Sequence, residues 1–340
     1  MRKEIIALTG ALGLALAACS PATDATDAAK LHITTSFYPL TYLVEEIAGD
    51  TVAITDLTPP GGSAHGVELS PSDIAKMQQS DLVIYAAKVA PAIDDAVAAA
   101  NLKSLNVAEY AELLPYPELA ARTAPGGIND DFLNREDEAT ADDDHSEHDD
   151  DQDDDHASHP EEHNHDHGTH DPHFWTDPDR MAQIAPVIAK ELSKLNPEQE
   201  DAYTTRAQEL KTQLEDLADK YETAFEATTC RTNAFIVSHE AFGYLADGFN
   251  LVQIGVAGID PEIEPSPARV KEIADLAKQY QVDTIFATSD AELRTVESIA
   301  EGSGLKAAVL DPVASQRDPN KDYMAVVEEN FKRLLAANGC

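Results

Sequence analysis

Short strand-like runs alternate with amphipathic helical runs from Leu31 to the end of the chain, and this alternation constrains the fold more than any other feature of the sequence. Leu31–Thr35 and Leu82–Tyr85 have the length and composition of strands, and between them apolar residues recur at helical spacing from Leu40 to Ile47. Strands that alternate with helices pair in parallel and carry the helices on the faces of the sheet. The pattern therefore predicts an α/β fold with parallel sheets flanked by helices.

One long helical run divides this alternation into two halves. A stripe of apolar residues continues without interruption from Glu198 to Ala227, and a helix of about 30 residues spans about 45 Å. A chain of 340 residues also exceeds what a single hydrophobic core usually serves. We expect an N-terminal α/β lobe over residues 31–197, one long rigid linking helix over 198–228, and a C-terminal α/β lobe over 229–340.

The first 19 residues have the composition of an export signal. Arg2 and Lys3 precede an apolar run from Ile5 to Ala17, which is shorter than the roughly 20 residues of a transmembrane helix. The sequence Leu-Ala-Ala-Cys that ends at Cys19 resembles the cleavage signal of bacterial lipoproteins, in which the cysteine receives lipid. We expect a signal peptide over residues 1–18, lipidation of Cys19 and a tether over 19–30. An ordinary secretory signal with an incidental cysteine is the alternative.

Two further cysteines, Cys230 and Cys340, form an even pair in a chain that is expected to be exported. Exported compartments are oxidising and favour disulfides, so we expect these two residues to be bridged. Two free thiols remain the alternative, because the sequence gives no distance between them.

Residues 125–170 interrupt the α/β pattern with an acidic, histidine-rich segment. Between Asp130 and Asp171 the chain carries 19 acidic residues and one basic residue, which is a large share of its formal net charge of -39. Few apolar residues and no periodicity predict disorder over about 125–170. Charge of this sign excludes a phosphate-backbone partner, so we expect no binding to nucleic acid. Imidazoles among carboxylates predict weak auxiliary metal binding, with a merely solvating linker as the alternative. The histidines concerned are His145, His148, His156, His159, His163, His165, His167 and His170.

Three side chains with metal-binding atoms follow predicted strands. His65 comes after the strand at Thr51–Leu57, His239 after Ala234–Val237, and Asp311 after Ala307–Leu310. Open parallel sheets collect ligands at the carboxyl ends of their strands, which places all three residues where a site would form.

A fourth candidate ligand, His173, lies just before a helix at the end of the histidine-rich segment. Three imidazoles and one carboxylate would form a closed tetrahedral site for Zn²⁺ in a cleft between the lobes, and a closed shell favours capture over catalysis. The linear spacing of the four residues carries no motif, so their positions alone leave open whether they bind metal or are incidental.

Several motifs, in order along the chain, resemble those of the zinc/manganese-type solute-binding proteins of bacterial ABC importers. They are Pro59-Pro60-Gly61-Gly62-Ser63-Ala64-His65, Asp171-Pro172-His173-Phe174-Trp175, Ser238-His239-Glu240-Ala241-Phe242-Gly243-Tyr244-Leu245, Glu262-Ile263-Glu264-Pro265-Ser266 and Leu310-Asp311-Pro312. The resemblance implies two α/β lobes joined by one long helix, with a metal ion between them. It places the ligands at His65, His173, His239 and Asp311, and His239 favours zinc because the manganese branch looks to carry Glu there.

The function that the resemblance implies is capture of zinc and its delivery to an ABC permease driven by an ATPase. We expect a monomer that is not an enzyme and that is anchored by lipid to the membrane on its extracytoplasmic side. A manganese receptor of the same family and a metal-storage or adhesin lipoprotein are the alternatives. A zinc hydrolase is disfavoured, because the sequence contains neither His-Glu-x-x-His nor Gly-x-Ser-x-Gly.

Overall fold

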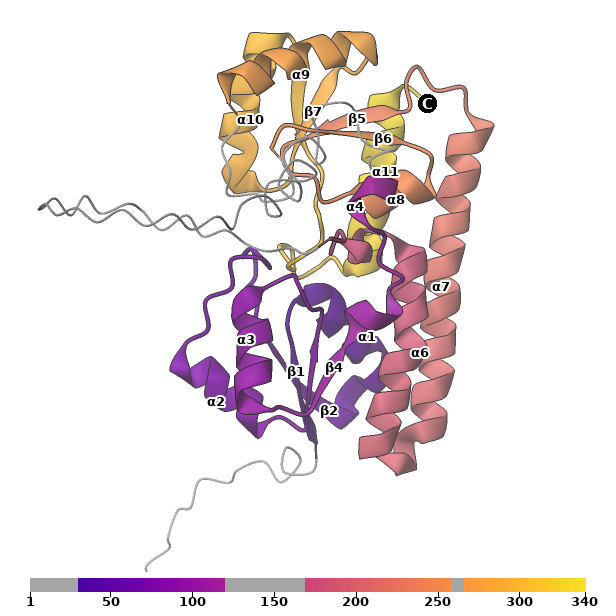
Figure 1. Cartoon of the computed structure of the whole chain (residues 1–340). Coiled ribbons are helices and arrows are strands. Elements are labelled where there is room, and N and C mark those ends of the chain that lie inside the picture. The colour runs from indigo at the N-terminus through magenta and orange to yellow at the C-terminus, as the bar shows by residue number, and fades with distance from the viewer. Residues whose placement is uncertain (1–29, 120–168, 258–265) are drawn as a thin grey trace, which may run out of the picture.

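Two four-stranded parallel sheets form the centres of the two lobes, which lie one above the other in Figure 1. The chain is described here by a computed structural model over residues 30–119, 169–257 and 266–340. The first sheet has the strand order β2-β1-β3-β4 and the second β6-β5-β7-β8. The strands are β1 (Leu31–Thr35), β2 (Val52–Asp56), β3 (Leu82–Tyr85), β4 (Ser104–Asn106), β5 (Ala234–Val237), β6 (Val252–Gly255), β7 (Thr284–Ala287) and β8 (Lys306–Val309). The parallel α/β prediction is confirmed, and the two lobes share one topology although no close sequence repeat relates them.

Ten α-helices connect and cover these sheets in the described ranges. They are α1 (Tyr38–Ala48), α2 (Pro71–Gln79), α3 (Pro91–Ala100), α4 (Tyr116–Leu119), α6 (Pro178–Leu195), α7 (Glu200–Ala227), α8 (Gly243–Gly248), α9 (Pro267–Gln279), α10 (Asp290–Ser303) and α11 (Tyr323–Asn338). Several begin where the sequence offers a cap. Ser70 and Asp73 form a capping box at α2, and the Ser266 side chain accepts a hydrogen bond from the Arg269 N–H at α9.

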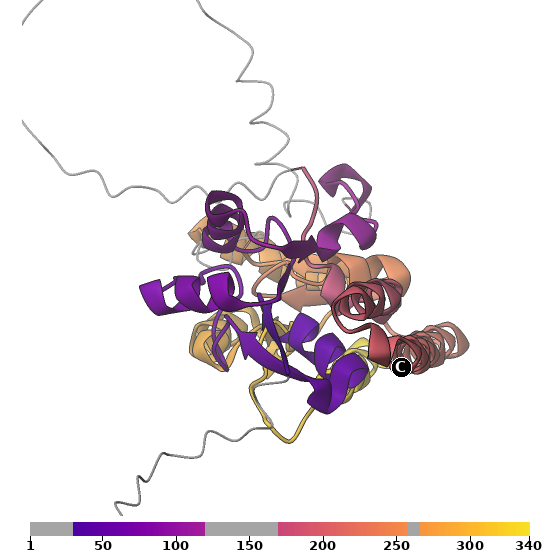
Figure 2. The same ribbon diagram turned by 90° about the horizontal axis from the view of Figure 1, so that it is seen from below.

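The long helix α7 runs beside both lobes and packs along α6, as both Figure 1 and Figure 2 show. It begins at Glu200, two residues later than the sequence pattern suggested, because Pro197–Gln199 form a 3-10 turn. Its buried side chains repeat at helical spacing, with Tyr203, Leu210 and Leu214 nearly inaccessible to solvent. The linking helix is therefore one half of a helical pair, which stiffens the connection between the lobes.

The central strands of the two sheets bury side chains on both faces, and alternate residues of β3 belong to different cores. Val83 packs with Met77 of α2 and Ile93 of α3 on the outer face, whereas Leu82 and Ile84 face the interior. The C-terminal sheet has its own outer core under α9 and α10. The inner faces of both sheets share a single continuous core with α1, α6, α7, α8 and α11.

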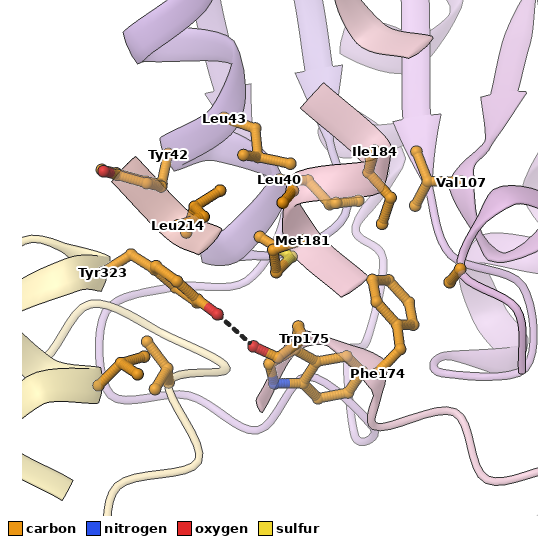
Figure 3. Close-up of a cluster of buried hydrophobic side chains, with 14 of the residues drawn as sticks. Leu40, Tyr42, Leu43, Val107, Phe174, Trp175, Met181, Ile184, Leu214 and Tyr323 are labelled. Atoms are coloured by element: carbon orange, nitrogen blue, oxygen red, sulfur yellow. Dashed lines mark hydrogen bonds between the residues drawn. The ribbon is translucent and has the colours of Figure 1, made fainter. Parts of the chain in front are cut away.

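Trp175 lies at the point where this shared core passes from one lobe to the other (Figure 3). Its ring contacts Phe37 edge to face at a centroid distance of 4.6 Å, and its Nε1–H donates to Pro312 O at 2.8 Å. The Tyr323 hydroxyl donates to Trp175 O at 2.7 Å. Burial of one large apolar side chain contributes roughly 1.5–3 kcal/mol to the free energy of folding. The buried side chains around Trp175 therefore stabilise this arrangement of the two lobes.

The C-terminus is tied to the start of the second lobe. Cys230 and Cys340 form a disulfide across a sequence separation of 110 residues, and Arg231 N–H donates to Asn338 O at 2.9 Å. Within the described ranges, no helix has the combined length and apolarity that crossing a bilayer requires.

Candidate metal centre

Three histidines from distant parts of the chain meet between the two lobes. The Nε2 atoms of His65 and His173 are 2.9 Å apart, and those of His239 and His173 are 3.2 Å apart. His173 and His239 are almost completely buried, and His65 is partly exposed. Within the residues that the structure describes, this is the one group of three or more His, Cys, Asp or Glu side chains with the geometry of a metal site.

His65 lies in the loop that follows β2, where Pro59–Gly62 turn the chain across the end of the first sheet. Its Nδ1 is 3.1 Å from Val89 O. A carbonyl oxygen can only accept, so Nδ1 carries the proton and Nε2 presents a lone pair to the other two rings. Val89 belongs to the loop after β3, and it is preceded by Lys88, whose φ of 72° is left-handed.

His173 is held by the carboxylate of Asp171, two residues earlier. Asp171 Oδ1 accepts from the main-chain N–H of His173 at 2.8 Å and from its Nδ1–H at 2.7 Å. Both side chains are buried, with exposed fractions of 1% for His173 and 0% for Asp171. A carboxylate that accepts from the outer ring nitrogen fixes the ring orientation and makes the inner nitrogen a stronger metal ligand.

His239 lies two residues after the end of β5, and the residue between them, Ser238, anchors the strand end. Ser238 N–H donates to Phe286 O at 2.8 Å, and Ser238 Oγ accepts from Thr288 N–H at 3.0 Å. These bonds tie the end of β5 to that of β7, so the position of His239 depends on the pairing of these central strands.

The converging nitrogens form an electron-rich pocket that suits a cation. The outer hydrogen bonds of His65 and His173 engage their Nδ1 atoms, which leaves the two Nε2 atoms, 2.9 Å apart, as the nitrogens that can bind a metal ion. Zn–N bonds of 2.0–2.1 Å in a tetrahedron separate ligand nitrogens by about 3.3 Å, which is close to the observed spacings. Imidazole nitrogens suit Zn²⁺, Cu²⁺ and Ni²⁺ better than they suit Mn²⁺ or Mg²⁺.

Asp311 does not join this group in the structure. Its Oδ1 accepts from Val313 N–H at 2.8 Å, and its Oδ2 lies 3.6 Å from Arg317 Nη1. It lines a cavity of about 250 Å³ between Tyr38 of the N-terminal lobe and Arg317 of the C-terminal lobe, and none of the three histidines lines this cavity. Burial raises the pKa of the Asp311 carboxyl above its ordinary value, and the Arg317 guanidinium opposes that rise.

Most of the other predicted site residues lie outside the described residues. This holds for Cys19 and for the histidines from His145 to His167. His170 is described and exposed, and its Nδ1 lies 2.8 Å from Thr169 Oγ1.

The sequence pattern indicated no separate role for Asp171 and none for the carbonyl of Val89. The Asp-Pro-His order was one signal for Asp171, because an Asp side chain readily accepts main-chain N–H groups two residues further on. Nothing in the sequence indicated Val89, because a main-chain carbonyl carries no residue identity.

A comparison with known families agrees with this geometry. Residues 33–337 match the model of the ZnuA family, described as zinc-uptake complex component A, periplasmic. The chain belongs to this family.

Two relatives illustrate how far the similarity of this ZnuA-family chain extends. It is 27% identical to the zinc-binding lipoprotein AdcA of Streptococcus pneumoniae (strain ATCC BAA-255 / R6), over 98% of this chain and 60% of AdcA. It is also 27% identical to the high-affinity zinc uptake system protein ZnuA of Bacillus subtilis (strain 168), over 90% of this chain and 86% of that protein. The chain thus spans about 60% of the length of AdcA and most of the length of the Bacillus protein.

Solved structures reproduce the two-lobed fold of this ZnuA-family chain. The laminin-binding protein Lmb of Streptococcus agalactiae has a TM-score of 0.70 and 28% identity, and the match covers 91% of this chain and 99% of Lmb. A Zn(II)-bound variant of AdcAII from Streptococcus pneumoniae has a TM-score of 0.70 and 26% identity, and the match covers 92% of this chain and 99% of AdcAII. Matches of this extent include both sheets and the long helix between them.

Proposed function

We propose that this protein captures Zn²⁺ between its lobes and delivers it to an ABC importer. The observation that carries the proposal is the convergence of three histidine Nε2 atoms, two of which are held as acceptors by their outer hydrogen bonds. Membership of the ZnuA family supports zinc as the cargo, and the names of AdcA and of the Bacillus protein point the same way. The description of the family as one component of a zinc-uptake complex supports a permease and an ATPase as its partners.

The deciding experiment is metal analysis followed by substitution of two ligands. Elemental analysis of the protein, purified without added metal, should find about one tightly held zinc per chain and little manganese. The His65→Ala/His239→Ala double variant should lose this zinc, because one imidazole cannot form a tetrahedral shell. If the double variant keeps wild-type zinc affinity, the three-histidine site is not the binding site.

We propose Asp311 as the fourth ligand once zinc is bound. Two observations support it: Asp311 follows β8 at the same sheet edge as His239, and the neighbouring Pro312 carbonyl is tied to Trp175, two residues after His173. Coordination would require the carboxylate to leave Arg317, which is 3.6 Å away. Asp311→Ala should weaken zinc binding while leaving the three-histidine site occupied at high zinc concentration. Unchanged affinity would leave the fourth position to water or to another group.

We propose that the acidic segment provides additional weak zinc sites. The support is its composition, with seven histidines between residues 145 and 167 among many carboxylates. A variant in which residues 121–167 are replaced by a short Gly/Ser linker tests this by titration. It should bind fewer zinc ions while its tightest site keeps its affinity. An unchanged number of bound ions would show that the segment does not bind zinc.

We further propose that residues 1–18 are removed, that Cys19 carries lipid, and that residues 19–30 tether the receptor to the membrane. The support is the Leu-Ala-Ala-Cys sequence together with the description of the relative AdcA as a lipoprotein. In cells, Cys19→Ala should move the protein from the membrane fraction to the soluble exported fraction. Retention of the variant at the membrane would refute lipid anchoring through this residue.

An adhesin role is a second candidate, favoured by solved structures of laminin-binding proteins with the same fold. The solved structure of Lmb describes that protein as having both adhesin and metal transporting activity. Immobilised laminin and the full-length chain test the idea directly. Saturable binding that survives the His65→Ala/His239→Ala change would support adhesion as a separate function, and absence of binding would remove it.

A further inference from the structure

The hydroxyl of Tyr244 connects three segments of the chain next to the metal centre. Tyr244 belongs to α8 in the C-terminal lobe and is fully buried. Its hydroxyl accepts from Leu114 N–H at 2.9 Å and donates to Asp171 O at 2.6 Å. One oxygen thus holds two segments of the other lobe.

These two segments are the chain ends that flank residues 120–168. Asp171 N–H donates to Leu114 O at 3.3 Å, and Tyr116 N–H donates to Thr169 O at 3.1 Å. Pro115 and His170 form an antiparallel bridge between them. The stem formed by residues 114–116 and 169–171 therefore ends on the Tyr244 hydroxyl.

The Tyr244 ring is itself fixed by a charged neighbour. The guanidinium of Arg180 lies 4.4 Å from the ring centroid, and its Nη1 donates to Ala111 O at 2.7 Å, just before the stem. A cation is attracted to the face of an aromatic ring. The Arg180 guanidinium therefore restricts the movement of the Tyr244 ring and of its hydroxyl.

Asp171 connects Tyr244 to the metal centre. Its main chain is bound by Tyr244, and its carboxylate holds both N–H groups of His173. The same carboxylate packs against Gly243, where an added Cβ would lie only 2.7 Å from Asp171 Oδ2. Two adjacent residues of α8 therefore set the position of the side chain that orients His173.

We propose that Tyr244 is a positioning residue for zinc binding, which acts by holding Asp171 so that the His173 ring stays aimed at the ion. The inference rests on the proposed function, because it concerns the affinity of the same three-histidine site. Tyr244 does not touch the metal. Removal of its hydroxyl takes the hydrogen bond from the Asp171 carbonyl and lets the segment that carries His173 relax.

The test compares Tyr244→Phe with Tyr203→Phe in the full chain. Tyr203 is an equally buried tyrosine on α7, and its hydroxyl lies 2.7 Å from Thr51 Oγ1 in the N-terminal lobe. Tyr244→Phe removes two hydrogen bonds and Tyr203→Phe removes one, so the metal-free Tyr244→Phe protein should lose more stability in denaturant unfolding. Chelator competition should show about a tenfold loss of zinc affinity for Tyr244→Phe and a change within about twofold for Tyr203→Phe.

A spectroscopic measurement separates positioning from general loosening. The visible absorption of bound Co²⁺ reports the geometry of its ligands, so it should change in Tyr244→Phe and stay unchanged in Tyr203→Phe. Gly243→Ala displaces the Asp171 carboxylate from its other side while keeping the hydroxyl, and it should lower zinc affinity as well.

Three results bear on the proposal in different ways. Wild-type affinity in Tyr244→Phe, beside lost affinity in His65→Ala/His239→Ala, overturns the positioning role and leaves the proposed function standing. Equal losses in Tyr244→Phe and Tyr203→Phe also overturn it, because the effect would then be one of stability. Wild-type affinity in both Tyr244→Phe and the double histidine variant overturns the inference and the proposed function together.

Discussion

The contact between Asp171 and His173 allows a prediction that separates charge from orientation in zinc binding. Asp171 Oδ1 accepts two N–H groups of His173, at 2.8 and 2.7 Å, in a place without access to solvent. Asp171→Asn keeps an oxygen that can accept both bonds but removes the negative charge. Asp171→Ala removes the acceptor as well. The two variants should therefore weaken binding by different amounts.

The expected magnitudes follow from these contacts. Outer partners of metal-bound histidines are worth about 10- to 100-fold in affinity. We place Asp171→Asn at the lower end, about tenfold or about 1.4 kcal/mol, and Asp171→Ala at the upper end, about 100-fold or about 2.7 kcal/mol. The Ala variant should also lose about 1–3 kcal/mol of stability as the metal-free protein for each buried donor that loses its acceptor.

The assay is zinc competition against a chromophoric chelator, together with denaturant unfolding of each metal-free variant. Asp56→Asn is the control, because Asp56 is a partly buried aspartate at the end of β2 whose carboxylate accepts from Thr41 Oγ1–H and from Thr58 N–H, each at 2.9 Å. Its zinc affinity should stay within about twofold of wild type. If Asp171→Ala binds zinc as tightly as this control does, the carboxylate does not orient His173 and the reasoning is wrong.

Further predictions concern fluorescence, the disulfide and pH. Trp175 is the only tryptophan of the chain, and its ring centroid lies 5.1 Å from that of His173. Zinc should therefore change the fluorescence emission of Trp175, with a break in the titration at one equivalent. A flat titration would contradict zinc binding at His173. The Cys230→Ser/Cys340→Ser pair opens a loop of 110 residues and should lower the free energy of unfolding by about 5 kcal/mol, with zinc affinity unchanged. A loss below about 1 kcal/mol would show that other contacts fix the C-terminus. Burial raises the pKa of Asp177 from 3.8 to about 7, so the folded protein keeps a proton that the unfolded chain releases at lower pH. The stability from this carboxyl is complete below about pH 4 and is lost as the pH rises through about 7. Asp177→Asn should remove this part of the pH dependence. If the free energy of unfolding changes equally between pH 5 and pH 8 in the wild type and in Asp177→Asn, the Asp177 carboxyl is not the source of that dependence.

Local sequence signals were sufficient for most of the elements. β1, β3 and β5 have the bounds that the sequence suggested, because short runs between turn residues define buried strands well. Ser70 and Ser266, each followed by a proline, are local signals of a helix start, and α2 and α9 begin directly after them. The sequence did not predict the short β4 or the start of α6 at Pro178, since three residues carry no readable period and the apolar stripe of α6 begins at Met181.

The order of the strands was beyond the reach of local signals. Periodicity describes which residues of a segment are buried, but it does not say which segment they are buried against. The shared topology of the two sheets and the inner core that crosses from lobe to lobe at Trp175 arise only when the whole chain is packed.

The amino-acid sequence by itself determined the α/β class, the long helix between two lobes and the residue types of a zinc site, because these depend on local periodicity and on side-chain chemistry. Only the tertiary structure decided which of the candidate ligands meet. His65 and His173 are 108 residues apart and His173 and His239 are 66 apart, so their contact depends on how two separate sheets pack on one core. The same packing pairs Asp311 with Arg317 and places Asp171 and Tyr244 behind His173. Such contacts are set by the summed burial of many side chains, which no single stretch of sequence contains.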